Sequence, residues 1–181
     1  MSLLRILIAV VVCAGGGYWL LIKDMYYTPA AELRAGREWP PSSVHVVVPW
    51  PRDGRISLIE GVTLALEELN ASASPLAGRL NVEFIDEPIV DRDPGRVSRR
   101  SAADGTVMVV IGHEQSEAAI ASAVTYEGKG ILYLSPKASL SRLTEHGFQY
   151  TFRLVPADPD FAEALANFSA RQGWNRIGVS R

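Results

Sequence analysis

Two serines each follow a short apolar run, in places where a hydroxyl can meet a ligand. Ser116 comes shortly after the run Val107 to Ile111, and Ser139 shortly after the run Ile131 to Leu134. A hydroxyl at a helix start lies beside free backbone amides and the positive end of the helix dipole, which suits a carboxylate. The alternative is structural, with Ser116 acting only as a helix N-cap. We take Ser116 and Ser139 as the first candidates for ligand contacts.

The segment that joins the two serines predicts how they are positioned. Both apolar runs are rich in β-branched residues or leucine, and a small-residue stretch with helical character, Glu117 to Glu127, separates them. This pattern is typical of a βαβ unit in a parallel sheet that is covered on both faces. Such crossovers are nearly always right-handed, so the polar ends of both strands share one edge, where open parallel sheets bind ligands. We therefore expect Ser116 and Ser139 to lie close together.

The preceding segments predict two more strands of the same sheet. Val44 to Val48 is a β-rich run that we interpret as a central first strand, and Leu80 to Phe84 alternates as a half-buried edge strand would. Between them, Ser57 and Glu60 have the spacing of a capping box at the start of a helix. That helix should end near Asn70, which we interpret as a helix terminator rather than a glycosylation site.

The remaining segments predict two proline-initiated helices and the ends of the fold. Asp93-Pro94 should open a short helix that runs to about Ala103. Tyr150 to Leu154 reads as a short strand or an extended crossing segment. A second helix is expected from Asp158 to Gln172, with an apolar stripe at helical spacing, and a last strand from Asn175 to Ser180.

Composition excludes several classes of function. The chain has 181 residues, of which 48% are hydrophobic and 21% charged, and a formal net charge of -2, so it is an ordinary globular sequence. We expect no nucleic-acid partner, because the local basic cluster is better interpreted as the solvated face of a helix. One cysteine, Cys13, excludes an internal disulfide framework, and three dispersed histidines give no metal-ligand spacing. We expect no metal and no cofactor. The basic cluster consists of Arg92, Arg96, Arg99 and Arg100.

The N-terminus predicts a membrane segment. Ile6 to Ile22 is uncharged for about 17 residues, or about 26 Å as a helix, near the lower limit for crossing a bilayer. It fits a signal peptide or an uncleaved anchor, and we favour the anchor because Tyr18-Trp19 lies where an interfacial aromatic belt would and no A-x-A cleavage site follows. Lipidation at Cys13 is disfavoured by the bulky Val12 before it. We expect an inner-membrane location with the globular part in the periplasm, or on the extracellular side.

A series of short motifs, each of them weak alone, is informative through its order and spacing. The motifs are Gly61-Val62, Ala65, Glu67-Glu68-Leu69-Asn70, Val110-Ile111-Gly112 with Ser116, Leu134 to Ser139, Leu143-Thr144, Gly147, Tyr150, Phe152-Arg153, Pro156 and Asp158. Through these motifs the chain from about Val44 to Arg181 resembles type I periplasmic solute-binding proteins of the leucine/isoleucine/valine-binding group, which serve ABC transporters. The resemblance implies two doubly wound α/β lobes with a small ligand clamped between them.

The resemblance also implies roles for individual residues. Ser116 matches the serine that hydrogen-bonds the ligand carboxylate, and Ser139 matches a hydroxyl residue that, with the backbone at Lys137, holds the ligand's amino group. Lys137 itself departs from the small residue usual there. Its ammonium could pair with an extra ligand carboxylate, or it could fill the cleft and abolish binding.

A proline-rich loop with Trp50 replaces the family's usual glycine-rich loop after the first strand. Trp50 could cover an apolar part of the ligand or pack the end of the lobe. His113 and Glu114 could also face the cleft, but we expect them at solvated loop positions.

These expectations divide the chain and rank its functions. We expect an anchor or signal at residues 1–23, a spacer at 24–43, a first α/β lobe at 44–152, and only the start of a second lobe at 153–181. The leading hypothesis is a non-catalytic binding protein that recognises a small polar ligand, such as an amino acid, for ABC-type uptake. The alternative is a sensor or interaction subunit of a membrane complex with a degenerate lobe. Enzyme activity is disfavoured because no nucleophile elbow or phosphate loop is found.

Overall fold

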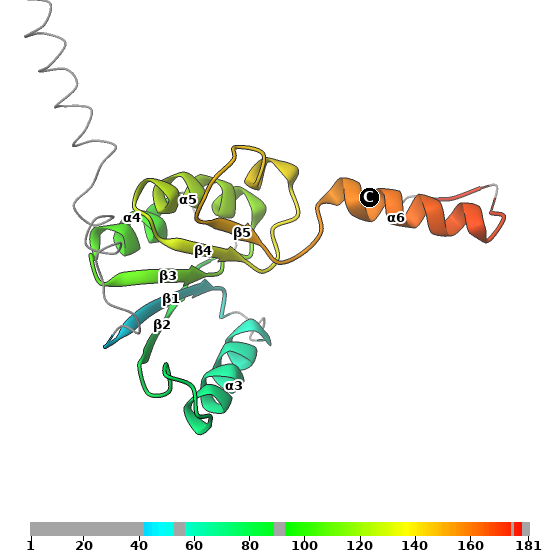
Figure 1. The fold of residues 1–181 in the computed structure, drawn as a ribbon. Helices are drawn as coiled ribbons and strands as arrows, with labels where there is room; N and C mark the ends of the chain where they lie inside the picture. The colour runs from blue at the N-terminus through cyan, green and yellow to red at the C-terminus, as the bar shows by residue number, and fades with distance from the viewer. Residues whose placement is uncertain (1–41, 53–56, 89–92, 175, 179–181) are drawn as a thin grey trace, which may run out of the picture.

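The described residues form a parallel five-stranded sheet with helices on both faces. The computed structural model describes residues 42–52, 57–88, 93–174 and 176–178. All four strand pairings are parallel, in the order β2-β1-β3-β4-β5 (Figure 1). The strands are β1 (Val44–Trp50), β2 (Leu80–Asp86), β3 (Val107–Ile111), β4 (Leu132–Ser135) and β5 (Thr151–Arg153).

The alternation of side chains along β1 builds two apolar cores. Val44, Val46 and Val48 point to one face, where Leu58 and Val62 of helix α3 (Ser57–Ala71) pack against them. Val47 points to the other face and joins the larger core. Because successive side chains of a strand alternate between faces, one apolar strand can serve both layers, as predicted for a sheet covered on both sides.

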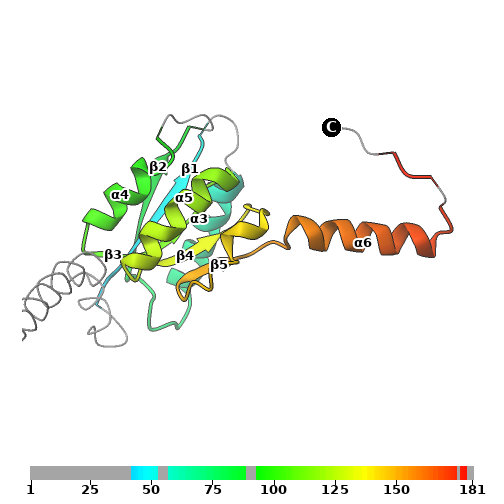
Figure 2. The ribbon, with the colours of Figure 1, turned by 90° about the horizontal axis from the view of Figure 1, so that it is seen from above.

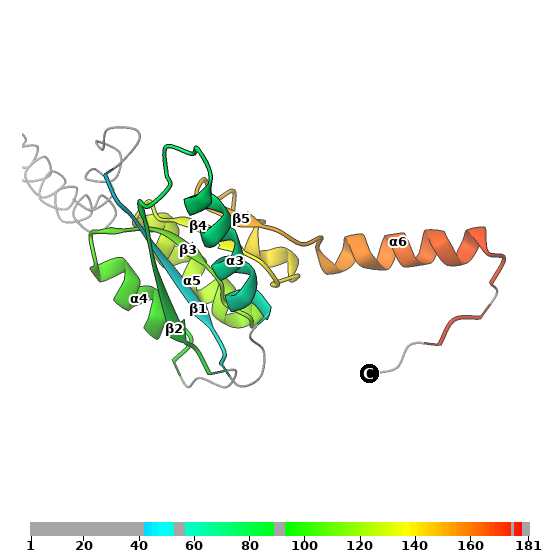
Figure 3. The ribbon, with the colours of Figure 1, turned by 90° about the horizontal axis from the view of Figure 1, so that it is seen from below.

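The larger core lies between the sheet and helices α4 (Arg96–Ala103) and α5 (Ser116–Gly128). Ala119, Ala123 and Tyr126 of α5 are fully buried against Val110 and Tyr133 of the sheet. The small residues predicted to make α5 helical thus let it approach the strands closely. Figure 2 and Figure 3 show α4 and α5 together on one face and α3 on the other.

The chain continues from β4 through a single helical turn, η1 (Ser141–Leu143), to β5 and then to helix α6 (Asp158–Arg171). The predicted start of α6 is confirmed, because Pro159 occupies the first turn and the Asp160 carboxylate accepts a hydrogen bond of 2.8 Å from the Ala157 amide. In all three views α6 extends away from the sheet. Its apolar stripe is therefore exposed.

The predicted boundaries are corrected at two places. The helix expected at Asp93-Pro94 begins at Arg96, because a turn closed by the Arg96 amide and the Asp93 carbonyl precedes it. The strand expected from Asn175 to Ser180 is absent from its described part, residues 176–178. A strand needs a hydrogen-bonded neighbour, and residues 176–178 do not pair with the described sheet.

The membrane segment expected at residues 6–22 lies outside the described residues. Among the helices that are described, none combines the length and apolar character that crossing a bilayer requires.

Candidate functional site

The two predicted serines line one hollow at the carboxyl edge of the sheet. Its volume is about 350 Å³, and loops after β3 and β4 form its walls together with the start of α6. The two strands are hydrogen-bonded neighbours in parallel, so the residues that follow them emerge at the same edge. The prediction that Ser116 and Ser139 lie together is confirmed. The lining residues are Glu114, Gln115, Ser116, Glu117, Lys137, Ser139, Leu140 and Asp158.

Ser116 is the first residue of α5, and Gln115 is the N-cap. The alternative in which Ser116 acts only as the N-cap is therefore wrong. Ser116 is half-buried and lines the hollow in the first turn of α5, where the backbone amides lack partners within the helix. This arrangement can accept a carboxylate, because the helix N-terminus adds positive potential to the hydrogen-bond donors.

The Ser139 carbonyl is fixed by hydrogen bonds from the start of α6 and from Arg153. Its carbonyl accepts a hydrogen bond of 3.0 Å from the Asp158 amide and one of 3.4 Å from Nη1 of Arg153. The same guanidinium nitrogen donates to the Leu140 carbonyl at 3.3 Å. These bonds fix the loop after β4, so the Ser139 wall of the hollow is preformed.

Charged side chains dominate the hollow. The carboxylates of Glu114, Glu117 and Asp158 line it together with the ammonium of Lys137, and Leu140 is its one aliphatic residue among those described. Lys137 donates to the Glu114 carboxylate in an ion pair that bridges the loops after β3 and β4. The Glu114 side chain is 2% exposed and that of Lys137 54% exposed. Two roles were considered for Lys137, pairing with a ligand carboxylate and filling the cleft, and both stay predictions.

The loop after β3 is tied to β1 by a close approach at Gly112. A Cβ atom at this position would lie 2.3 Å from the Pro49 carbonyl oxygen, so a side chain cannot fit without displacing backbone. The same oxygen accepts a hydrogen bond of 3.1 Å from the His113 amide. Pro49, near the end of β1, thus anchors the loop that carries Glu114 and Ser116.

His113 and Glu114 are both buried, which corrects the expectation that they are solvated. His113 adopts φ 59°, a conformation uncommon for residues other than glycine, and its ring is 0% exposed. Nδ1 donates to the Glu87 carboxylate at 2.8 Å, and in a neutral ring Nε2 then accepts the Tyr126 hydroxyl at 2.9 Å. These partners stabilise the strained backbone, because a buried imidazole left without them would be costly.

The His113 ring packs with two tyrosine rings beneath the hollow. The centroids of Tyr126 and Tyr133 lie 5.8 and 5.7 Å from that of His113 and 5.0 Å from each other. The Tyr133 hydroxyl donates to the Gly112 carbonyl at 3.2 Å. Burial raises the pKa of the Tyr126 and Tyr133 phenols well above the ordinary value, and repulsion from the Glu87 carboxylate adds to the shift. This layer supports the site and does not open into it.

Trp50 ends β1 and is 5% exposed. It is not among the described residues that line the hollow. Its burial agrees with the alternative in which the ring packs the end of the lobe.

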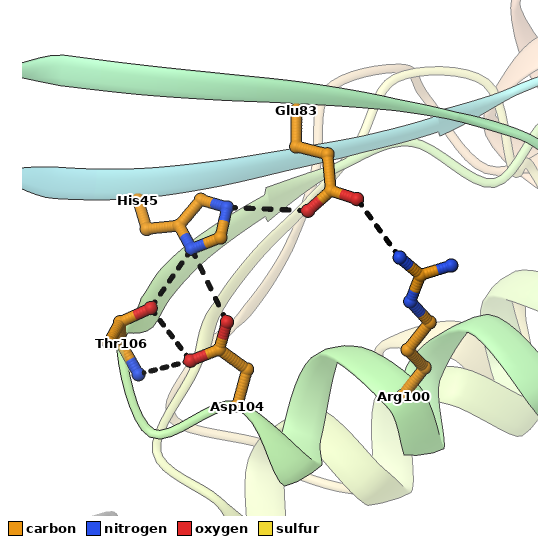
Figure 4. A network of polar contacts seen from close by, with 5 residues as sticks. All are labelled: His45, Glu83, Arg100, Asp104 and Thr106. Atoms are coloured by element: carbon orange, nitrogen blue, oxygen red, sulfur yellow. Dashed lines mark hydrogen bonds and ion pairs between the residues drawn. The ribbon is translucent and has the colours of Figure 1, made fainter.

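A second polar cluster lies at the opposite ends of the strands (Figure 4). His45, at the start of β1, contacts the Thr106 hydroxyl at 3.0 Å, the Asp104 carboxylate at 3.6 Å and the Glu83 carboxylate at 3.5 Å, and Arg100 pairs with Glu83 at 3.3 Å. In the described part of the chain no three such side chains are arranged to hold a metal ion. The cluster ties β1 and β2 to the end of α4 and to the loop that follows it.

Comparisons with known proteins agree with this architecture. The chain is 27% identical over 108 residues to the Leu/Ile/Val-binding protein of Escherichia coli K12, covering 60% of the chain and 29% of that protein. It is 38% identical over 104 residues to Leu/Ile/Val-binding protein homolog 1 of Brucella abortus 2308, covering 55% and 26%. No family model matches the chain.

Comparison with a solved structure identifies the fold. An ABC transporter substrate-binding protein from Desulfitobacterium hafniense superposes with a TM-score of 0.67 and 30% sequence identity, over 72% of this chain and 39% of that one. The α/β unit has the fold of type I periplasmic binding proteins. The predicted resemblance is therefore confirmed. The chain spans less than a third of the length of the curated relatives it matches.

Sequence reasoning missed several residues of this lobe. Asp158 was identified as a helix start but lines the hollow, and a polar residue at a helix N-terminus on the carboxyl edge was the available signal. Glu87 and Tyr126, which bind the His113 ring, could not be identified from the sequence. They lie 26 and 13 residues away from His113 on other parts of the chain.

Proposed function

We propose that this chain is a non-catalytic solute-binding protein that recognises a small polar ligand, such as an amino acid, for ABC-type uptake. The observation that carries the proposal is the hollow at the carboxyl edge, where Ser116 and Ser139 face the same space from neighbouring strands. Relatives named for leucine, isoleucine and valine binding support it, as does a related protein of 30% identity solved in complex with Leu.

The chemistry of the hollow fits an amino acid. The hydroxyl of Ser116 and the N-terminus of α5 would receive the carboxylate, and Ser139 with the backbone at Lys137 would hold the amino group. Asp158 and Glu117 add negative charge near that amino group, because both line the same hollow. Binding would close a second lobe onto this one by hinge motion, with Phe152-Arg153 to Asp158 as the start of the crossing.

The location follows from the same proposal. Residues 6–22 would keep the chain in the inner membrane, as an uncleaved anchor, and the lobe would lie in the periplasm, where an uptake system collects its solutes. The transporter would then be the membrane partner.

Isothermal titration of the full-length, detergent-solubilised chain against the twenty amino acids tests the proposal. We expect at least one to bind, and Ser116→Ala to weaken it by about 1 to 3 kcal/mol through loss of a hydrogen bond to a charged group. Ser72→Ala is the matched control, because Ser72 lies after α3, away from the hollow. A folded wild-type chain that binds none of the twenty would refute the proposal.

A second candidate function has one observation in its favour. Phe161, Leu165 and Phe168 of α6 are each 46% to 56% exposed, in a row of large apolar side chains at helical spacing. Such a stripe is typical of an interaction surface, which would suit a sensor or interaction subunit of a membrane complex. Co-purification of the chain with membrane components, compared with a Phe161→Ser/Leu165→Ser/Phe168→Ser variant, separates this candidate from solute binding.

A further inference from the structure

The ion pair between Glu114 and Lys137 places a compensated charge in the wall of the hollow. Glu114 stands two residues before Ser116 on the loop after β3, and Lys137 two residues before Ser139 on the loop after β4. Both line the hollow with the serines, and the Lys137 ammonium donates to the Glu114 carboxylate. The pair therefore joins the two loops that carry the candidate ligand contacts.

Without the Lys137 ammonium, the Glu114 carboxylate would oppose a carboxylate ligand. Its side chain is 2% exposed, so water screens its charge poorly, and it lies on the loop whose serine would receive the ligand carboxylate. Like charges a few ångströms apart repel strongly where the effective dielectric constant is low. Lys137 supplies the opposite charge at the carboxylate itself.

Lys137 is also placed to act without supporting the core. Its side chain is 54% exposed, whereas the next residue of its loop, Ala138, is fully buried in the larger core. Substitution of Lys137 should therefore change the charge of the hollow more than the packing of the lobe.

We propose that Lys137 determines the specificity of this site by neutralising Glu114, so that the hollow accepts ligands with a carboxylate. The inference rests on the proposed solute-binding function and names the ligand class of the same site. Lys137 acts through Glu114 in this scheme, as a specificity-determining residue whose ammonium cancels a charge rather than binding the ligand.

A double-mutant cycle tests the inference with two probes, L-leucine and L-leucinamide, which differ only in the carboxylate. Titrations of the full-length chain compare wild type with Lys137→Met, Glu114→Gln and the double variant. We expect Lys137→Met to weaken L-leucine by about tenfold or more and L-leucinamide far less. We expect the double variant to bind L-leucine within about twofold of wild type, because the repelling charge is gone.

The control variant is Lys129→Met, which removes a lysine at the other end of α5 and should leave both affinities unchanged. Thermal unfolding of every variant verifies that the lobe is folded. If another amino acid binds more tightly to wild type, that amino acid and its amide replace the leucine pair.

Two results would overturn the inference while leaving solute binding intact. Lys137→Met could bind L-leucine as wild type does, or the double variant could remain as weak as Lys137→Met, which would mean that Lys137 contacts the ligand itself. A wild-type chain that binds none of the amino acids refutes the proposed function, and the inference falls with it.

Discussion

At the residue scale, one glycine shows how tightly the loop under the hollow is held. Gly112 passes so close to the Pro49 carbonyl that no side chain fits. Valine and isoleucine before it predict a strand, and the glycine marks where the strand ends, but only the contact with β1 shows why glycine is needed.

We expect Gly112→Ala to lower the free energy of unfolding by about 2 kcal/mol or more, because backbone must move to admit the methyl group. Gly61→Ala is the matched control, since the Cβ position at Gly61 of α3 is open and alanine favours the helix by up to about 1 kcal/mol. Urea unfolding of both variants measures the difference. Equal stabilities would contradict the close approach.

The buried tyrosines make stability depend on alkaline pH. In the unfolded chain a phenol loses its proton near the ordinary pKa of 10.0, whereas burial raises the pKa of Tyr126 well above that value in the folded chain. The folded state therefore binds more protons above pH 10. The contribution of the buried, protonated phenol to the free energy of unfolding is fully present below pH 10 and is lost as the pH rises beyond it.

We expect the free energy of unfolding to fall above pH 10, by up to about 1.4 kcal/mol per pH unit for each buried phenol. Tyr126→Phe should make this fall shallower, although it also removes the hydrogen bond to His113 and lowers stability at neutral pH by about 1 kcal/mol. Urea unfolding from pH 8 to 11.5 measures the slope. A fall of equal steepness in the wild type and in Tyr126→Phe would contradict the prediction.

At the element scale, α6 differs from the helices that cover the sheet. Helices α4 and α5 bury their apolar faces in the larger core, whereas α6 exposes Phe161, Leu165 and Phe168. Helical spacing predicted the stripe on α6 correctly, but it could not predict whether anything covers the stripe. The periodicity of apolar residues identifies a face and not its partner.

We expect Leu165→Ser to change the free energy of unfolding by less than about 0.5 kcal/mol, because the side chain is 56% exposed. By contrast, Ile131→Ala should cost about 2 to 5 kcal/mol, since Ile131 is fully buried between α5 and β4. Thermal unfolding of the two variants provides the comparison. A large loss for Leu165→Ser would show that the stripe packs against part of the chain.

At the scale of the whole molecule, the parallel sheet gives its two edges different characters. The amino edge carries the polar cluster around His45 (Figure 4), and the carboxyl edge carries the hollow that Ser116 and Ser139 line. Parallel strands with crossover helices bring every strand's end to the same side, so polar residues separated in sequence converge there. This convergence is what makes the carboxyl edge the place to test binding.

Up to α6, the sequence by itself determined the kinds of element, their order and the edge at which the two serines meet. Strand and helix periodicities are local, and the handedness of the crossover fixes the edge. Only the tertiary structure decided that Glu114 is buried beneath Lys137 and that His113 is held between Glu87 and Tyr126. Those partners lie 13 to 26 residues apart, and side chains that distant meet only when packing brings their elements together.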